Sequence, residues 1–319
     1  MKRLISIVVP AYNEELVLHQ FREALAPELL RQPEYDFEII IVNDGSSDRT
    51  QQVIEELHRL DARIGGIDLS RNFGKEIAMT AGLDHAKGDA VVVIDADLQD
   101  PPSLIHDFIA EWNNGYDVVY ARRTHRDAES WLKKATAKYF YKLIGAVSDV
   151  EIPANTGDYR LMSRRAVEGL LQLRERHRFM KGLFAWIGFP AKAIDYRRKP
   201  RIAGTTKFNY WRLWNFALEG ITSFTSAPLK LATYFGFLVA MVAFVAGLWI
   251  IVKTLVWGER IAGYPTLIVS MLFLGGIQIF FIGVLGEYLG RIYNETKQRP
   301  LYLVKKLLVP QPAPPAAPR

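Results

Sequence analysis

The sequence predicts an α/β fold with a doubly wound, mostly parallel sheet, followed by a membrane-associated helical region. Three observations carry this prediction. Short apolar runs rich in β-branched residues alternate with helix-length segments through the first 120 residues. Polar and charged residues follow each run, where a strand of such a sheet would end. Two long runs without charge lie beyond residue 230.

The apolar runs are the predicted strands. Each is apolar enough to be buried on both faces and is separated from the next by room for a helix. They cover residues 4–9, 37–42, 67–69, 90–94 and 117–120. This alternation is typical of units in which a helix joins two neighbouring parallel strands.

The run at residues 90–94 ends on two carboxylates one residue apart, Asp95 and Asp97. A buried strand cannot carry unpaired carboxylates in its interior, so we expect both at its carboxyl end, where open α/β sheets bind ligands. With the amide oxygen of Gln99 they form a donor set suited to Mg²⁺ or Mn²⁺. A polar turn in which Asp100 or Ser103 caps the next helix explains the same residues without a ligand.

Polar side chains also follow the other predicted strands, and the carboxyl ends of parallel strands share one edge of the sheet. These side chains are Tyr12, Glu14, Asp44, Arg71, Lys75, Arg122 and Arg123. A Gly-x-Gly-x-x-Gly turn is absent after the first strand, and no Walker loop is present. Carboxylates for a metal and arginines for phosphate therefore predict a nucleoside diphosphate bridged by a divalent cation.

Composition narrows the class of protein. The chain has 319 residues, a formal net charge of +6 and no cysteine, so disulfides and thiolate metal sites are excluded. A net positive charge is suited to binding nucleic acid, a membrane surface or phosphorylated ligands. Because the basic stretch at residues 197–207 precedes a hydrophobic run, it favours anionic head groups or a lipid phosphate over nucleic acid. No signal peptide precedes the first strand, so we expect the N-terminal part in the cytoplasm.

The two uncharged runs, residues 231–252 and 266–284, predict a transmembrane hairpin. A bilayer core takes roughly 20 apolar residues to cross. Basic residues are more numerous before the first run and after the second than in the loop at 253–265, which predicts both termini in the cytoplasm. A helix pair buried inside a soluble protein is the alternative.

An amphipathic helix is predicted just before the hairpin. Its apolar residues recur at helical spacing and suit the membrane interface; they are Trp211, Trp214, Leu218 and Ile221. A helix packed on the N-terminal domain is the alternative. The predicted regions are an α/β domain (1–205), an interfacial helix region (206–230), the hairpin (231–290) and a cytoplasmic tail (291–319), disordered at its Pro- and Ala-rich end.

Several motifs, in order along the chain, give it a specific resemblance. Those similar to glycosyltransferase family 2, with its GT-A fold, are Val-Val-Pro-Ala-Tyr-Asn-Glu at 8–14, Val-Asn-Asp-Gly-Ser at 42–46 and Asp-Ala-Asp at 95–97. Within that family the chain resembles the polyprenyl-phosphate glycosyltransferases, above all the bactoprenol glucosyltransferases, through residues 71–75, 97–101, 157–163 and 207–209. The resemblance extends from residue 4 to about residue 306, hairpin included.

The resemblance implies an inverting, metal-dependent transfer of a sugar from a nucleotide sugar to a polyprenyl phosphate. UDP-glucose and undecaprenyl phosphate are the substrates it favours, with Mg²⁺ or Mn²⁺, at the bacterial plasma membrane. UDP-formamidoarabinose and GDP-mannose are alternative donors, because the aminoarabinose transferases and dolichol-phosphate mannose synthases are similar too. A non-catalytic membrane subunit that binds sugar nucleotides is the alternative of another class, and a homo-oligomer is left open.

The resemblance also assigns residues. It places the donor against Pro10, Tyr12, Glu14, Asp44, Lys75, Asp95, Ala96 and Asp97, and the metal on Asp95, Asp97 and Gln99. Candidates to hold the acceptor phosphate, or alternatively the donor diphosphate, are Arg122, Arg123 and Lys207. The residues named for catalysis are Asp158, Asp97, Arg122 and Lys207.

Asp158 matches the position proposed as general base. A phosphate monoester has a second pKa near 6, so the acceptor is already largely ionised at neutral pH and needs little proton abstraction. We therefore expect Asp158 to orient the acceptor or the donor sugar, with general base as the weaker alternative. Discrimination among sugars is expected in a loop at 154–160 and a helix at 179–187.

Overall fold

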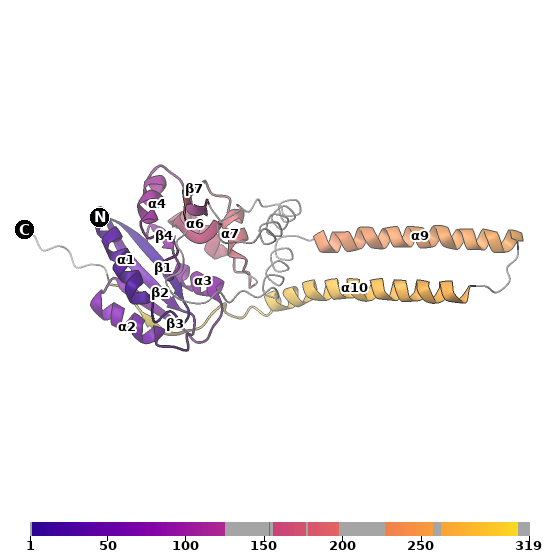
Figure 1. Ribbon diagram of the computed structural model, residues 1–319, viewed down its shortest axis with the longest axis horizontal. Helices are drawn as coiled ribbons and strands as arrows, with labels where there is room; N and C mark the ends of the chain where they lie inside the picture. Colours follow the sequence, from indigo (N-terminus) through magenta and orange to yellow (C-terminus); the bar gives the residue numbers. More distant parts are fainter. Residues whose placement is uncertain are drawn as a thin grey trace, which may run out of the picture.

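The α/β domain is built on one eight-stranded sheet. The computed structural model describes residues 2–124, 153, 156–176, 178–197, 227–257 and 263–311. The strands are β1 (Arg3–Ala11), β2 (Tyr35–Asn43), β3 (Ile64–Leu69), β4 (Ala90–Val93), β5 (Val118–Arg123), β6 (Thr156–Ser163), β7 (Ala191–Tyr196) and β8 (Val304–Leu308). Their order is β7-β5-β6-β4-β1-β2-β3-β8, which puts β1 and β4 in the interior of the sheet (Figure 1).

The sheet is mixed. β1 pairs in parallel with β2 and β4, β2 with β3, and β5 with β7. β6 runs antiparallel between β4 and β5, and β8 runs antiparallel to β3. The sequence predicts the first five strands but neither β7 nor β8, and it places a loop at 154–160 where β6 begins. That interpretation was wrong because Gly157, Asp158 and Arg160 make the start of β6 look polar, although Arg160 is buried.

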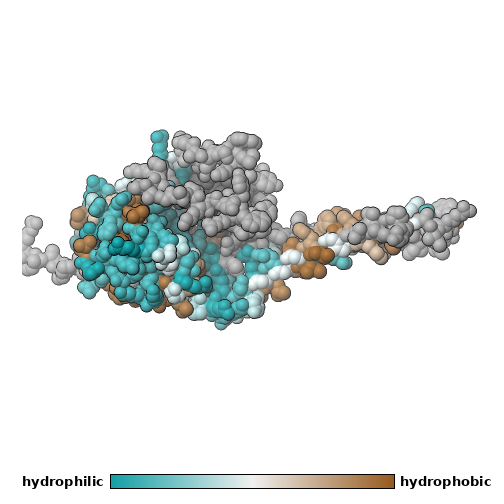
Figure 2. Space-filling view, turned by 60° about the horizontal axis from the view of Figure 1, so that its bottom comes forward, coloured by the Kyte–Doolittle hydropathy of each residue, from teal (hydrophilic) through white to brown (hydrophobic). Residues whose placement is uncertain are grey.

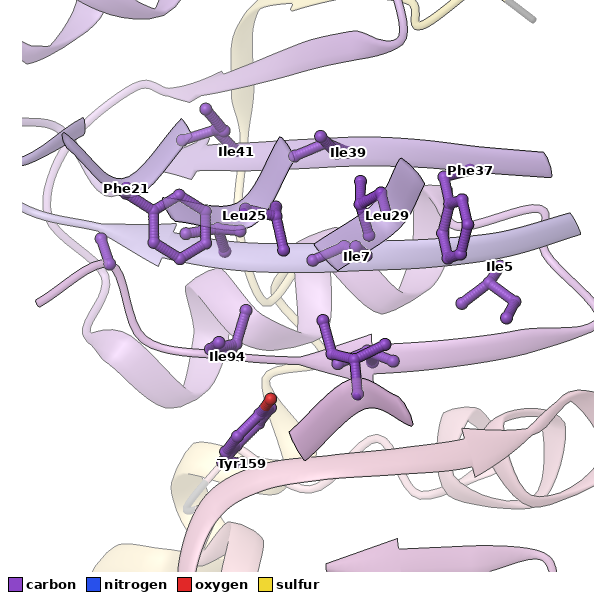
Figure 3. Packing of buried hydrophobic residues seen from close by; sticks show 14 of the residues in the cluster. Ile5, Ile7, Phe21, Leu25, Leu29, Phe37, Ile39, Ile41, Ile94 and Tyr159 are labelled. Atoms are coloured by element: carbon purple, nitrogen blue, oxygen red, sulfur yellow. The ribbon is translucent and has the colours of Figure 1, made fainter. Parts of the chain in front are cut away.

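Helices cover both faces of the sheet. The flanking helices are α1 (Leu18–Leu30), α2 (Thr50–Leu60), α3 (Lys75–His85), α4 (Leu104–Asn113), α6 (Arg164–Gln172) and α7 (Met180–Trp186). Side chains of α1, α2 and α4 pack on one face, and those of α3, α6 and α7 on the other. Figure 3 shows Phe21, Leu25 and Leu29 of α1 packed among the isoleucines of β1 and β2. Because alternate residues of each central strand point into different cores, these strands are mostly apolar, as the sequence indicates.

Two long helices, α9 (Ala227–Trp257) and α10 (Tyr264–Thr296), extend side by side from the domain (Figure 1). They touch through Phe235 and Phe281, whose ring centroids are 5.9 Å apart. Their apolar side chains are exposed, Ile279 by 73% and Phe244 by 69%, and Figure 2 shows this hydrophobic surface beyond the hydrophilic domain. Within the described residues one stretch, Phe273–Thr296, is long and apolar enough to cross a membrane, and Ala232–Ala246 is a shorter apolar helix. The predicted interfacial helix, through residue 226, lies outside the described residues.

The chain returns to the sheet after α10. β8 pairs with β3 inside the predicted tail, and the backbone N–H of Ser70 donates to Leu303 O at 2.9 Å. Lys306 Nζ lies 2.8 Å from Glu55 Oε1, and the Tyr302 hydroxyl donates to Asp84 at 2.8 Å. The tail therefore closes one edge of the sheet and ties the end of α10 to the α/β domain.

Gly65→Ala tests this attachment. A Cβ on Gly65 would lie 2.7 Å from Leu308 O and 2.9 Å from Pro310 N, so β3 and the returning segment must separate. We expect a loss of about 1–3 kcal/mol in the unfolding free energy, measured by denaturant titration in detergent, and faster proteolysis near β8. Gly236→Ala, where a Cβ meets nothing within 4 Å, is the control. Equal stability of the two variants would contradict the attachment.

Candidate active site

One cavity of about 320 Å³ opens at the carboxyl ends of β1, β2 and β4, beside the start of α3. All eight side chains predicted for the donor line it, and four further residues join them. The lining consists of Pro10, Ala11, Tyr12, Glu14, Asp44, Asn72, Gly74, Lys75, Ala78, Asp95, Ala96 and Asp97. The structure thus brings together four separate stretches of sequence in a space with acidic groups and one lysine.

Asp44, just after β2, holds the loop that leads into α3. Its Oδ1 accepts a hydrogen bond from the Phe73 N–H at 2.7 Å, and its Oδ2 accepts one from Gly74 at 2.9 Å. Burial raises the pKa of Asp44, and these two bonds offset part of the rise. Gly45 has a φ of +62°, and a Cβ there would lie 2.3 Å from the Arg71 carbonyl carbon, so only glycine fits. Asp44 therefore shapes the cavity wall through the backbone that it binds.

Lys75, the first residue of α3, stands between two carboxylates. Its Nζ lies 2.7 Å from Asp95 Oδ1 and 2.6 Å from Asp158 Oδ2. Asp95 follows β4 and Asp158 lies near the start of β6, so one ammonium group joins three elements. The Lys75 side chain is 43% exposed, whereas those of Asp95 and Asp158 are 24% and 15% exposed. We call this arrangement of Lys75, Asp95 and Asp158 the ion bridge. Its lysine is open to the cavity, whereas its two carboxylates are mostly covered.

Within the ion bridge, each charged group shifts the pKa of the others. Burial would raise the pKa of Asp158, but Lys75, with help from Arg160 and Lys181, lowers it to about 2. Burial raises the pKa of Asp95, with Lys75 opposing the rise. Burial would lower the pKa of Lys75, yet the two carboxylates raise it above its usual value. Asp158 thus stays ionised at neutral pH, and a carboxylate with so low a pKa is a weak general base.

The turn after Asp95 carries the oxygen atoms suited to a metal. Gln99 Oε1 is buried without a hydrogen-bond partner, and the Gln99 N–H donates to Asp97 Oδ1 at 3.1 Å. Leu98 has a φ of +54°, a left-handed conformation that costs an L-residue roughly 1–2 kcal/mol. An orphaned buried oxygen and a strained turn beside two carboxylates fit a hard divalent cation.

The carboxylates alone do not complete such a site. In the part of the chain that the structure describes, no group of three or more His, Cys, Asp or Glu side chains is arranged to hold a metal. Asp95 is shared with Lys75, so the third protein oxygen would be the amide of Gln99. Magnesium and manganese commonly keep water or substrate phosphate as their remaining ligands, so this set remains compatible with either ion.

Arg122 and Arg123, adjacent on β5, have different partners. Arg122 donates through Nε and Nη2 to both carboxylate oxygens of Asp195, at 2.6 and 2.9 Å, in a pair about half exposed. Arg123 Nε donates to the Tyr196 hydroxyl at 3.2 Å, and its Nη2 lies 3.1 Å from the position of a Cβ on Gly157. Arg123 is therefore beside the backbone of Asp158, whereas Arg122 is engaged elsewhere. Lys207 lies outside the described residues.

Two neighbours of Asp158 are absent from the sequence-based prediction. Arg160 is 4% exposed, donates to the carbonyls of Gly157 and Asp158, and lies with its guanidinium carbon 3.4 Å from the centroid of the Phe184 ring. Lys181 lies on α7 and acts on the Asp158 carboxylate electrostatically. The available signal for Lys181 was a lone charge within an apolar helix.

Comparison with known sequences identifies the class of protein. Residues 6–171 match the family described as glycosyl transferase family 2, which covers the strands and acids of the cavity. Residues 227–292 match the family described as the GtrB C-terminal hairpin, which covers α9 and nearly all of α10. The chain belongs to glycosyl transferase family 2 and carries this hairpin after its catalytic domain.

Relatives match over nearly the whole chain. An uncharacterized glycosyltransferase of Synechocystis is 51% identical over 95% of both chains. A prophage bactoprenol glucosyl transferase homolog of Escherichia coli is 49% identical over 95% of this chain and 99% of its own length. The bactoprenol glucosyl transferase of Shigella phage SfV is 49% identical, over 94% and 98%. The solved structure of a Mycobacterium tuberculosis glucosyl-3-phosphoglycerate synthase is more distant, with 20% identity and a TM-score of 0.47 over 69% of this chain and 78% of that one.

Lys75→Met tests the bridge through stability. The pKa of Asp158 in the folded chain, about 2, is below its usual 3.8, so this group stabilises the fold above about pH 4 and loses that effect as the pH falls toward 2. Without the lysine two carboxylates face each other. We expect a loss of roughly 2 kcal/mol at pH 7, and a smaller loss at pH 4 because protonation relieves the repulsion. Thermal unfolding between pH 4 and 8 measures this difference.

Lys306→Met is the matched control for that series. It also breaks a lysine–carboxylate pair, with Glu55 at 2.8 Å. The Lys306 and Glu55 side chains are 50% and 34% exposed, so this pair is closer to solvent. Exposed pairs contribute at most about 1 kcal/mol. If Lys75→Met destabilises no more than Lys306→Met at pH 7, the bridge does not organise the site.

Proposed function

We propose that this chain transfers glucose from UDP-glucose to undecaprenyl phosphate, with inversion at the anomeric carbon. One observation carries the proposal: the side chains expected to bind a nucleotide sugar line one cavity beside Asp95 and Asp97. Relatives named bactoprenol glucosyl transferase, 49% identical over 95% of the chain, support the polyprenyl acceptor and the glucosyl donor.

The donor lies in the cavity, with its diphosphate toward Asp95, Asp97 and Lys75. Asp97 and Gln99, with Asp95, would hold Mg²⁺ or Mn²⁺; when bound, the ion neutralises charge that develops on the leaving nucleoside diphosphate. Lys75 brings a second cation to the same cavity wall. Like-charge repulsion among the acids and the diphosphate is thereby reduced before the sugar is transferred.

The acceptor needs orientation more than activation. Its phosphate is already largely dianionic at neutral pH, and Asp158, with a pKa of about 2, has little capacity to take a proton. Asp158 holds Lys75 in place and keeps a fixed negative charge beside the cavity that Lys75 lines. In this proposal it positions the reacting groups and does not change its protonation.

The hairpin anchors the enzyme where its lipid substrate lies. We place α9 and α10 across the bacterial plasma membrane, with the catalytic domain and both termini in the cytoplasm. The exposed apolar side chains of both helices support this placement, because water would not be a stable environment for them (Figure 2). The basic residues after α10, Lys297 and Arg299, agree with a cytoplasmic end.

A donor panel tests the function. The purified full chain in detergent is incubated with undecaprenyl phosphate, Mg²⁺ or Mn²⁺ and either UDP-glucose, UDP-formamidoarabinose or GDP-mannose. We expect a lipid-linked hexose from UDP-glucose by mass spectrometry, a β linkage by NMR, and loss of turnover with EDTA that added metal restores. A product from another donor would replace glucose in the proposal. Folded protein that forms no lipid-linked sugar with any of them would favour the non-catalytic alternative.

The pH–rate profile of Asp158→Asn tests the role of this residue. If Asp158 positions the reactants, the variant loses roughly 10²-fold or more in kcat at every pH from 6 to 9, because misplacement does not depend on protonation. If Asp158 were the base, activity would recover at high pH, where the acceptor is fully ionised. Recovery toward the wild-type rate above pH 8 would therefore overturn the positioning role.

A further inference from the structure

Lys181 is a charged side chain among buried apolar neighbours. Met180, Leu183 and Phe184 of the same helix are at most 6% exposed, and Lys181 itself is partly buried. Burial lowers its pKa; Asp158 opposes this effect and Arg123 adds to it. A charged amine in such surroundings costs free energy unless an anion accompanies it, so the position of Lys181 needs a physical reason.

Packing of α7 against β6 places Lys181 beside Asp158. The Phe184 ring lies against the Arg160 guanidinium, 3.4 Å from ring centroid to the guanidinium carbon, and Arg160 is two residues after Asp158. Lys181 precedes Phe184 by three residues and so lies on the same side of α7. Arg123 approaches the same residues from β5, with Nη2 3.1 Å from the position of a Cβ on Gly157. Lys181 and Arg123 therefore flank the Gly157–Asp158 segment.

Around Asp158, positively charged side chains outnumber negatively charged ones. Asp158 is already bound to Lys75 at 2.6 Å, and the Arg160 guanidinium is fixed by backbone carbonyls. Glu76 also acts on Lys181, but burial first and Asp158 second raise the pKa of Glu76 to about 8, so it is largely neutral at pH 7. Among the residues with described positions, no carboxylate forms an ion pair with Lys181. Asp95 and Asp100 act on Arg123, but Asp95 is paired with Lys75 and Asp100 accepts a hydrogen bond from the Tyr196 hydroxyl. Lys181 and Arg123 can thus bind a doubly charged anion.

We propose that Lys181 and Arg123 bind the phosphate of the lipid acceptor and hold it beside Asp158. This inference rests on the proposed function and adds Lys181 to it as a phosphate-binding residue. One phosphate oxygen attacks the anomeric carbon and forms the new C–O bond; the bond from that carbon to the UDP oxygen breaks, and its electron pair leaves with UDP. No proton has to move. The other acceptor oxygens remain on Lys181 and Arg123 through charge-assisted hydrogen bonds.

The same chemistry would also suit the β-phosphate of the donor, but the geometry favours the acceptor. Neither Lys181 nor Arg123 lines the donor cavity, which Lys75 does. Asp158 contacts Lys75 directly and interacts electrostatically with Lys181, so both lysines approach one carboxylate. A donor diphosphate beside Lys75 and an acceptor phosphate on Lys181 would then both lie close to Asp158, as transfer between them requires.

Lys181→Met is compared with Lys181→Arg and with Lys87→Met, a control at an exposed lysine in the turn between α3 and β4. KM is measured separately for undecaprenyl phosphate and for the nucleotide sugar. We expect Lys181→Met to raise the acceptor KM roughly 10- to 100-fold, the effect of losing one charge-assisted bond, with the donor KM changed less than about threefold. Lys181→Arg restores most of the affinity, and Lys87→Met leaves both values at wild type.

A binding measurement separates this inference from the proposed function. The full chain in detergent is titrated with citronellyl phosphate and with citronellol, and no turnover is needed. We expect Lys181→Met to weaken binding of the phosphate about tenfold or more without changing that of the alcohol. A raised donor KM with unchanged acceptor binding would assign Lys181 to the donor diphosphate and overturn the proposal, as would unchanged values for both substrates. Wild-type protein that binds the phosphate through Lys181 but transfers no sugar would defeat the proposed function alone.

Discussion

The ammonium group of Lys75, held between Asp95 and Asp158, is the interaction on which the geometry of the site depends. A lysine in the first turn of a helix opposes the helix dipole, so local helix stability does not explain its place. Its two carboxylates come from neighbouring strands that run in opposite directions. Both lie within 2.7 Å of the one ammonium nitrogen, so they would repel each other without it. One cation thus holds the end of β4, the start of β6 and the start of α3 at one point.

The antiparallel strand β6 makes this meeting possible. A purely parallel sheet would bring only carboxyl strand ends to the active edge, and each acid there would follow its own strand. Because β6 enters from that edge, its first residues, Gly157 and Asp158, arrive between β4 and β5. Asp158 can then contact Lys75 while Arg123 packs against Gly157. The donor side and the basic side of the site are therefore joined by the strand that departs from the parallel pattern.

Much of the cavity lining could be predicted from the sequence because its rule is local. Tyr12, Asp44 and Asp95 each directly follow an apolar strand, so strand recognition and the parallel arrangement suffice to bring them to one edge. The other side follows no local rule. Asp195, which binds Arg122, is 73 residues away in sequence. Asp158, near the start of β6, is paired with Lys75, which is 83 residues away. β8 is similarly hidden: five mostly exposed residues become a strand only through pairing with β3.

With the hairpin in the proposed membrane position, the returning tail also constrains where the cavity lies relative to the bilayer. Only residues 297–303 separate the end of α10 from β8, and seven residues span at most about 25 Å, so the edge of the sheet cannot move far from the helix. Tyr302 and Arg174 both bind Asp84 near the carboxyl end of α3, and Lys75 begins the same helix about 15 Å away. A rigid helix thus links the tail to the ion bridge. For the proposed lipid acceptor, whose phosphate would lie at the surface of the bilayer, this link would matter more than cavity volume. It would determine whether the headgroup can reach Asp158 while the lipid chain stays in the membrane.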